Sequence, residues 1–320
     1  MSRYRHSLPQ LSGMPFLTDG GLETTMIYHE GIELPEFAAF VMLDDPGQAR
    51  ILEQYYRRYA EIAYERGTGF LLEGTTYRAS AFWGAKIGYD AAALDRINRA
   101  SMKMLASIRD DYESRPGCGR MVISGCIGPK GDAYSGASTA TADQAEAYHR
   151  VQIDTFVGTE ADMISLHTMP TIQEALGGVR AARAARMPVA VSFTVETDGN
   201  LPSGETLEDA ISEIDRATDN YPAYYMINCA HPSHFEGMLA GQSWTRRIMA
   251  VQANPSCRSH DELAALDGID AGDPDEFGAA HLEIHQKLEN LSVFGGCCGT
   301  DERHLVSLFD TLLAQPEPNG

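Results

Sequence analysis

The sequence predicts an α/β protein with a single (β/α)8 barrel, the TIM-barrel architecture, over residues 1–320. Eight short apolar segments rich in β-branched residues recur along the chain, and helical patterns separate them. Strict alternation of strand and helix favours parallel pairing through right-handed crossovers, and eight such units close naturally into a barrel. A doubly wound open sheet remains the alternative, because periodicity alone does not show closure.

Each expected element can be placed by its own pattern. The expected strands, all short and apolar, are 16–18, 70–72, 121–123, 163–166, 189–193, 224–227, 248–251 and 291–294. The expected amphipathic helices are 48–66, 91–114, 143–159, 171–185, 206–219, 233–240, 275–290 and 302–314. A long acidic segment at about 252–276 follows the seventh strand, and we interpret it as a solvated surface loop rather than a lid.

Composition favours small-molecule chemistry in the cytoplasm. The chain has 320 residues, 43% of them hydrophobic, and its formal net charge of −20 opposes attraction to nucleic acid or to an anionic membrane. The basic N-terminus is followed by Pro9, Gln10 and Ser12 instead of an apolar core, so a signal peptide is not expected. Six cysteines are too sparse for a disulfide framework, which favours metal-binding thiols in a reducing compartment.

Three cysteines carry the strongest functional signal. Cys229 follows the sixth expected strand, and Cys297 and Cys298 follow the eighth, between glycines. The C-terminal rim of a barrel gathers the ends of non-adjacent strands, and the glycines let the strand break so that adjacent cysteines can face one ion. Three thiolates can hold Zn²⁺ and leave its fourth position open, as in catalytic sites. We therefore expect a substrate thiol to enter that position as a thiolate and to receive a methyl group.

Other rim residues are candidate substrate contacts. Asp19 follows the first strand, and Glu73 follows the second, where it is equally compatible with satisfying a backbone group. The methyl donor of such a reaction is expected to be an onium cation, which aromatic faces can bind. The aromatic residues near expected strand ends are Tyr77, Phe82, Trp83 and Tyr224. Each alone is commoner in a core, and only Tyr77 is favoured for a substrate role.

The remaining histidines and cysteines give weaker signals. His281 and His285 have the spacing of a helical metal pair, but they lack the glutamate of a zincin motif, so a solvated helix face is favoured. His231 and His234 follow Cys229 closely and are candidates for a fourth zinc ligand or for orienting the loop. The cysteines without a recognised spacing, expected to be buried or inert, are Cys118, Cys126 and Cys257.

Several segments together resemble the zinc-dependent homocysteine S-methyltransferases. They are Thr18-Asp19-Gly20-Gly21, 76–80, 125–129, 192–194 with Gly204, Asn228-Cys229, and Gly295-Gly296-Cys297-Cys298-Gly299-Thr300. The resemblance implies a (β/α)8 barrel, zinc on Cys229, Cys297 and Cys298, and Asp19, with Gly20 beside it, near the amino-acid part of the thiol. It also implies methyl transfer to homocysteine, giving methionine, from S-methylmethionine, S-adenosylmethionine or betaine.

One position departs from that resemblance. Members of the family usually carry a glutamate after the fourth strand, in a Glu-Thr-x-Pro segment that binds the substrate amino group, whereas this chain has His167-Thr168-Met169-Pro170. A histidine lacks the permanent negative charge of glutamate. Either Asp19 and Glu73 hold the ammonium of homocysteine, or His167 reads a different thiol or selenol. A histidine that only satisfies its neighbours' hydrogen bonds is the structural alternative.

Two other classes fit the sequence less well. A non-catalytic zinc or methyl-acceptor sensor would become alkylated on its own thiolates, but the chain has no basic DNA-binding patch or extra domain. A hydrolase would favour histidine and carboxylate ligands, because three thiolates lower the Lewis acidity of the metal. We therefore favour a methyltransferase with small-molecule partners and no nucleic-acid or membrane partner. A homo-oligomer is compatible with the sequence.

Overall fold

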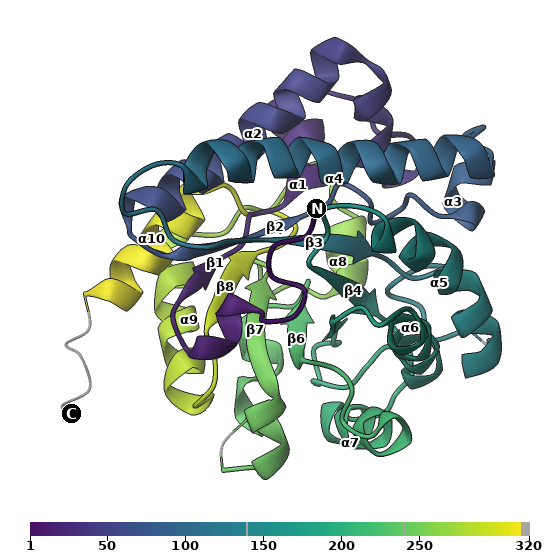
Figure 1. Ribbon diagram of the computed structural model, residues 1–320. Helices are drawn as coiled ribbons and strands as arrows, with labels where there is room; N and C mark the ends of the chain where they lie inside the picture. Colours follow the sequence, from purple (N-terminus) through teal and green to yellow (C-terminus); the bar gives the residue numbers. More distant parts are fainter. Residues whose placement is uncertain (139, 240, 315–320) are drawn as a thin grey trace.

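The expected strands form a closed parallel barrel in chain order (Figure 1). The computed structural model describes residues 1–138, 140–239 and 241–314. β1 pairs with β2 on one side and with β8 on the other, so that Phe16 lies opposite Val293 and the barrel closes. The predicted (β/α)8 fold is confirmed, and the doubly wound alternative is wrong.

The strands are short, and nearly all their residues are buried, because the barrel interior covers one face and helices cover the other. They are β1 Phe16–Leu17, β2 Gly69–Glu73, β3 Met121–Ile127, β4 Met163–Met169, β5 Val189–Phe193, β6 Tyr224–Asn228, β7 Ile248–Ala253 and β8 Val293–Gly296.

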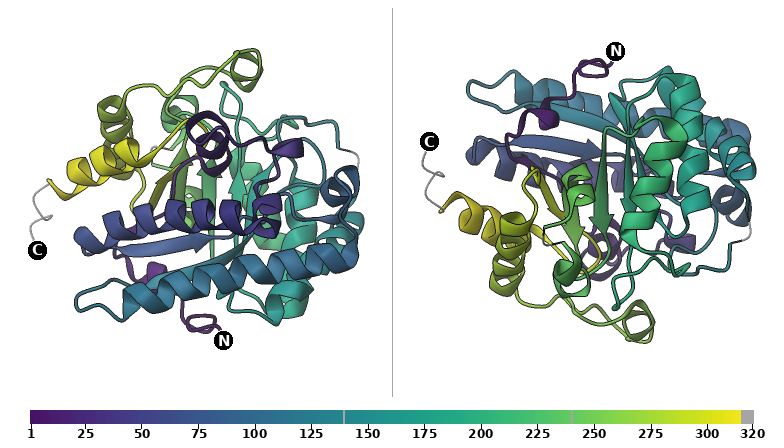
Figure 2. Two further views of the ribbon diagram at one scale, coloured as in Figure 1. Left: turned by 90° about the horizontal axis from the view of Figure 1, so that it is seen from above. Right: turned by 90° about the horizontal axis from the view of Figure 1, so that it is seen from below.

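The main helices surround the strands on the outside (Figure 2). They are α2 Pro46–Glu65, α4 Ala91–Glu113, α5 Ala142–Val157, α6 Ile172–Ala185, α7 Leu207–Thr218, α9 Pro274–Lys287 and α10 Glu302–Leu313. Each begins after an aspartate or threonine whose side chain accepts backbone N–H groups of the first turn, which explains why the helices start where they do. No helix in the described part of the chain is long and apolar enough to cross a membrane.

The segment after β6 differs from the prediction. Instead of a helix over 233–240, it forms two short 3₁₀ turns, Pro232–His234 and Glu236–Met238, and residue 240 lies outside the described residues. The segment is too short for a stable helix, and Gly237 lowers its helix propensity further.

Short helices that the sequence pattern did not predict lie on the rim. They are α1 Leu22–Thr24, which continues into a π-turn, α3 Ala81–Lys86, and α8 His260–Ala264. α8 lies inside the acidic segment 252–276, so that segment is partly ordered into a helix. These elements are too short to produce a recognisable period in the sequence.

The opposite, N-terminal end of the barrel is filled by side chains. Tyr224 begins β6, is fully buried, and its hydroxyl lies 3.4 Å from Nε2 of Gln10, which belongs to a 3₁₀ turn beneath the barrel. The expectation that Tyr224 is a core residue is confirmed, because the residue starts its strand at the end far from the rim where Cys229 lies. It belongs to the packed interior layer with Met226, Ala250 and Val293.

Candidate active site

Three strands place the cysteines. Cys229 directly follows β6, and Cys297 follows β8, while β7 lies between these two strands. The Cys229 N–H donates to the carbonyl oxygen of Gln252 at 3.1 Å, and the Cys297 N–H donates to the carbonyl of Ala253 at 2.9 Å. Since both acceptors belong to β7, one strand fixes both cysteines, and their Cα atoms lie 5.4 Å apart.

The glycines allow this close approach. β8 ends at Gly296, and Cys297 and Cys298 lie in the turn that follows, as the sequence predicted. A Cβ atom on Gly295 would collide with the hydroxyl of Thr18, so only glycine fits there. Gly299 has φ 92°, a left-handed conformation that glycine adopts without strain. The turn therefore directs both sulfurs toward Cys229.

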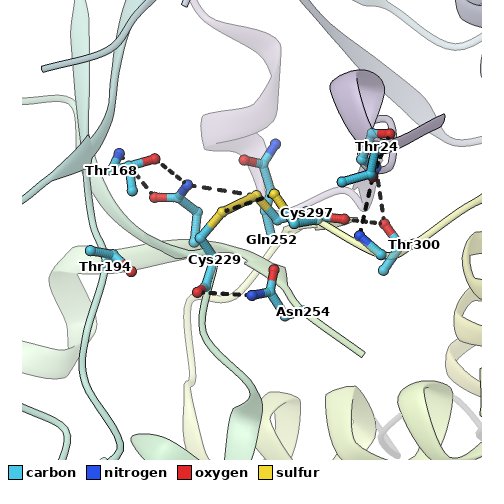
Figure 3. The surroundings of a disulfide bond; sticks show 12 residues. Thr24, Thr168, Thr194, Cys229, Gln252, Asn254, Cys297 and Thr300 are labelled. Carbon is cyan, nitrogen blue, oxygen red and sulfur yellow. Dashed lines mark hydrogen bonds between the residues drawn. A yellow bond between two sulfur atoms is a disulfide. The ribbon is translucent and has the colours of Figure 1, made fainter. Parts of the chain in front are cut away.

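The structure joins the sulfurs of Cys229 and Cys297 as a disulfide (Figure 3). This differs from the expectation of free thiols throughout, because the fold brings these two sulfurs into contact from strands distant in sequence. The third sulfur, of Cys298, lies 3.9 Å from that of Cys229. All three sulfurs fall within 4.8 Å of one another.

The donor set fits a metal ion once the disulfide is reduced. Sulfurs bound tetrahedrally to Zn²⁺ at about 2.3 Å lie roughly 3.8 Å apart, which is close to the separation of Cys229 and Cys298. Burial raises the pKa of the Cys298 thiol to about 12, and the negative charge of Glu23 adds to the shift. The protein alone therefore holds this thiol protonated, and a bound cation is what would favour its thiolate form.

A cavity of about 100 Å³ opens beside the sulfurs. The predicted site residues that line it are Asp19, Gly20, Glu73, Tyr77, His167, Cys229, Cys297 and Cys298. The barrel thus brings together every residue that the sequence assigned to the site, from β1, β2, β4, β6 and β8. Sequence reasoning missed several others in the same wall: Glu23, Phe37, Tyr134, Thr168, Asn228 and Gln252.

A buried polar network spans this cavity. His167 Nε2 lies 2.8 Å from Glu73 Oε1, and Gln252 Nε2 donates to Glu73 Oε2 at 2.7 Å and to the Thr18 hydroxyl at 2.8 Å. Burial alone would raise the pKa of Glu73, but the charge of His167 and the hydrogen bonds from His167 and Gln252 hold it below its usual value. Glu73 therefore stays ionised. Its carboxylate satisfies side chains, not the strand-end backbone group that the sequence suggested.

An irregularity in β4 aims His167 into the cavity. Thr168 has φ 56°, which is unusual for a β-branched residue, and the pairing register between β4 and β5 shifts between Leu166 and Met169. Asn228 stabilises this conformation, because its Oδ1 accepts from the Thr168 N–H at 3.1 Å and its Nδ2 donates to the Thr168 hydroxyl at 2.8 Å. Asn228 directly precedes Cys229, so it links the histidine segment to the cysteines.

Two further carboxylates face the cavity with fewer partners. Burial, and next the charge of Glu73, raise the pKa of Asp19 well above its usual value. Burial raises the pKa of Glu23 to about 7. The Glu23 carboxylate forms no side-chain hydrogen bond with another described residue, which leaves it free to bind a ligand. Glu23 lies in the short helix α1, and an element of this length gave no sequence signal.

The other aromatic candidates lie in different places. Trp83 is buried and donates its Nε1–H to the Pro129 carbonyl at 3.1 Å, so its indole is part of the packing. Phe82 is exposed and lies outside the cavity. Tyr77 is the one aromatic residue predicted from the sequence that lines the cavity, beside the newly found Phe37 and Tyr134.

The weaker histidine candidates do not join the cysteines. His231 Nδ1 bonds Ser233 at 2.8 Å and His234 Nε2 bonds the Cys257 carbonyl at 2.9 Å, so both fix the loop after β6. Neither belongs to the metal-binding group formed by the described residues.

The prediction of a solvated face for His281 and His285 is wrong for His281. That ring is fully buried, and its centroid lies 4.3 Å from that of the Phe277 ring in a tilted arrangement, because α9 packs this face against α10. Burial lowers the pKa of His281 to about 4. The prediction of buried or inert thiols holds for Cys126, which is buried and lines the cavity, whereas Cys118 is partly buried and Cys257 is exposed.

Comparison with known proteins agrees with this geometry. The family model described as homocysteine S-methyltransferase matches residues 16–312. A homocysteine S-methyltransferase of Escherichia coli is 24% identical, with 91% of this chain and 93% of that protein covered. The Bacillus subtilis homocysteine S-methyltransferase YbgG is 22% identical, over 93% of this chain and 95% of that protein. A selenocysteine Se-methyltransferase of Brassica oleracea is also 22% identical, over 93% of this chain and 89% of that protein.

Solved structures share the fold. The Escherichia coli homocysteine methyltransferase MmuM in its oxidised form superimposes with a TM-score of 0.72 at 19% identity, over 98% of this chain and 99% of that one. Its metallated form superimposes with a TM-score of 0.72 at 18% identity, over 95% of this chain and 98% of that one.

Proposed function

The chain belongs to the homocysteine S-methyltransferase family and is a methyltransferase, and from this membership we propose that it methylates homocysteine with zinc held by Cys229, Cys297 and Cys298. The observation that carries the proposal is the group of three sulfurs within 4.8 Å of one another at the wall of a cavity on the barrel rim. A zinc ion bound there would lower the pKa of an incoming thiol so that it is a thiolate at neutral pH.

The protein's own residues would position the acceptor. Asp19 and Glu23 line the cavity without an ion pair to a described residue, so they are the groups that we assign to the acceptor ammonium. Glu73 is less suited, because His167 and Gln252 already occupy its oxygens. His167 thus supports Glu73 and lines the cavity, in place of the glutamate expected at that position.

The transfer itself needs little acid–base chemistry. The thiolate sulfur uses an electron pair to bond the methyl carbon as the bond from that carbon to the donor heteroatom breaks. The donor takes that electron pair and loses its positive charge. The thiol proton leaves before the transfer. Tyr77, Phe37 and Tyr134 would exclude water and face the cation, and the donor candidates are S-methylmethionine, S-adenosylmethionine and betaine.

A different thiol or a selenol is the second acceptor to test. The specific reasons are His167 at the position of the expected glutamate and the similarity to a selenocysteine Se-methyltransferase. We also propose that residues 1–320 form one domain and that the protein acts in the cytoplasm. Its proposed partners are small molecules, not nucleic acid or a membrane, and a homo-oligomer remains part of the proposal.

The test is multi-turnover methyl transfer by the reduced, zinc-reconstituted protein. Mass spectrometry should show methionine from homocysteine with at least one onium donor. Cys229→Ala, Cys297→Ala and Cys298→Ala should each lower zinc content and abolish transfer while the circular dichroism spectrum stays that of a folded barrel. Cys257→Ala, at an exposed cysteine away from the site, is the matched control and should retain both properties. Full zinc content in all three site variants would contradict the proposal.

A further inference from the structure

A second cavity, of about 380 Å³, adjoins the sulfur site. It shares Phe37, Tyr77, Tyr134 and Cys298 with the first cavity, so these four residues separate the two. Residues of the acidic segment form its outer wall, namely His260, Leu263, Ala264, Gly268, Ile269 and Asp270. The segment expected to be only a solvated loop therefore encloses space beside the reacting atoms.

One cation in this second cavity forms neither a hydrogen bond nor an ion pair with the described residues. Arg78 lines the cavity, and its Nε is buried without a hydrogen bond. Among the residues that the structure describes, no carboxylate forms an ion pair with Arg78. A buried donor without an acceptor is costly, and a guanidinium presents a planar set of N–H groups that matches a carboxylate.

The guanidinium is already oriented for such a partner. It stacks on the Trp83 indole with its Cζ 3.6 Å from the ring centroid, and Trp83 is fixed by its bond to Pro129. Stacking uses the face of the guanidinium and leaves the N–H groups at its edge available. Arg78 also lies 5.8 Å from the centroid of the Tyr77 ring, which lines both cavities.

The other charges of the cavity are compensated. Asp270 accepts from the Ser256 hydroxyl at 2.8 Å and from Arg258 Nε at 3.0 Å. Burial lowers the pKa of His260, which favours its neutral form at pH 7. Arg78 is therefore the charge on the described wall of this cavity that forms no ion pair. Its positive charge does act on Glu23, whose pKa it lowers, but the carboxylates of Asp19 and Glu23 line the first cavity.

From this arrangement we propose that Arg78 binds the carboxylate of the methyl donor. The inference rests on the proposed function. The aromatic residues between Arg78 and Cys298 would face the onium centre, and Arg78 would hold the far end of the donor. The acceptor occupies the first cavity, which Arg78 does not line.

The experiment compares S-methylmethionine with its primary amide, which lacks the negative charge. The wild-type enzyme should use the acid with a kcat/KM about tenfold to a hundredfold higher than the amide, the range of one charge-assisted hydrogen-bonding pair. Arg78→Gln should lose activity with the acid and little with the amide, so that the preference falls to within about threefold. The KM for homocysteine and the zinc content should stay unchanged.

Lys86→Gln is the matched control. Lys86 Nζ lies 4.5 Å from the centroid of the same Trp83 ring, but it pairs with Glu36 and does not line either cavity. This variant should keep the wild-type preference. An unchanged preference in Arg78→Gln, or a rise in the KM for homocysteine alone, would overturn the assignment of Arg78. Absence of transfer from every onium donor by the wild type would instead overturn the proposed function, and this inference with it.

Discussion

Replacing His167 with glutamate would restore the residue expected in the family but place two carboxylates side by side. His167 Nε2 lies 2.8 Å from Glu73 Oε1, and both side chains are buried. At this distance and an effective dielectric constant near 20, two like charges repel each other by about 6 kcal/mol before desolvation is added. His167→Glu removes the hydrogen bond to Glu73 and adds this repulsion, so we expect a strong loss of stability.

Protonation limits the part of this loss that comes from repulsion. One carboxyl can take up a proton, and at pH 7.5 this costs about 4 kcal/mol for a group whose ordinary pKa is about 4.3. The folded variant then binds more protons than its unfolded form between the ordinary and the raised pKa. Its stability therefore falls as pH rises through that window and recovers toward low pH, with a protonation cost of about 2 kcal/mol at pH 5.5.

The assay is thermal unfolding at both pH values. His167→Glu should melt roughly 6–10 °C below the wild type at pH 7.5, with a smaller difference at pH 5.5. The exchanged double variant Glu73→His with His167→Glu should recover at least half of the loss. His149→Glu is the matched control, because His149 and Glu174 form a buried pair at 3.0 Å that lies outside the sulfur cavity.

The control separates stability from recognition. His149→Glu should lower the melting temperature but leave the preference among acceptor thiols unchanged, whereas the exchanged variant should change that preference. A melting temperature of His167→Glu within about 1 °C of the wild type at pH 7.5 would refute the pairing of Glu73 with His167.

Two further predictions follow from the burial of single residues. Between pH 7 and pH 5 the wild type should lose about 2 kcal/mol of stability through His281, because burial lowers its folded pKa to about 4 and the unfolded state then binds more protons. His281→Leu should flatten this part of the curve in urea unfolding, and an unchanged slope would contradict the burial of the neutral ring. Tyr77→Leu should lower kcat/KM for the onium donor at least tenfold, while Tyr224→Phe should leave it within twofold because Tyr224 lies at the far end of the barrel. Equal effects of the two tyrosine variants in steady-state kinetics would contradict this placement.

The order of strands and the position of the cysteines could be predicted because both depend on local patterns. The period of hydrophobic residues, the length of a strand and the glycines around Cys297 can all be recognised from residues that are neighbours in the sequence. Placing Asp19, Glu73 and Cys229 on one rim followed from the geometry of any barrel. The absent helix over 233–240 and the short rim helices were not predictable, because such short elements are decided by tertiary contacts.

Which side chains pair with each other could not be predicted from the sequence, for a different reason. Glu73 and His167 belong to β2 and β4, which are separated by β3, so they meet only across the barrel interior. The left-handed conformation of Thr168 that aims His167 depends on Asn228, which is distant in sequence. Glu23 and Arg78 became candidates only when the structure showed which charges already have partners.

The most direct test of the central claim is zinc X-ray absorption on the reduced enzyme, with and without saturating selenohomocysteine. We predict one zinc per chain with three sulfur neighbours at about 2.3 Å in the free enzyme, and an added zinc–selenium contact when the acceptor is bound. A spectrum that keeps only the three protein sulfurs and a light atom at saturating acceptor would contradict the account.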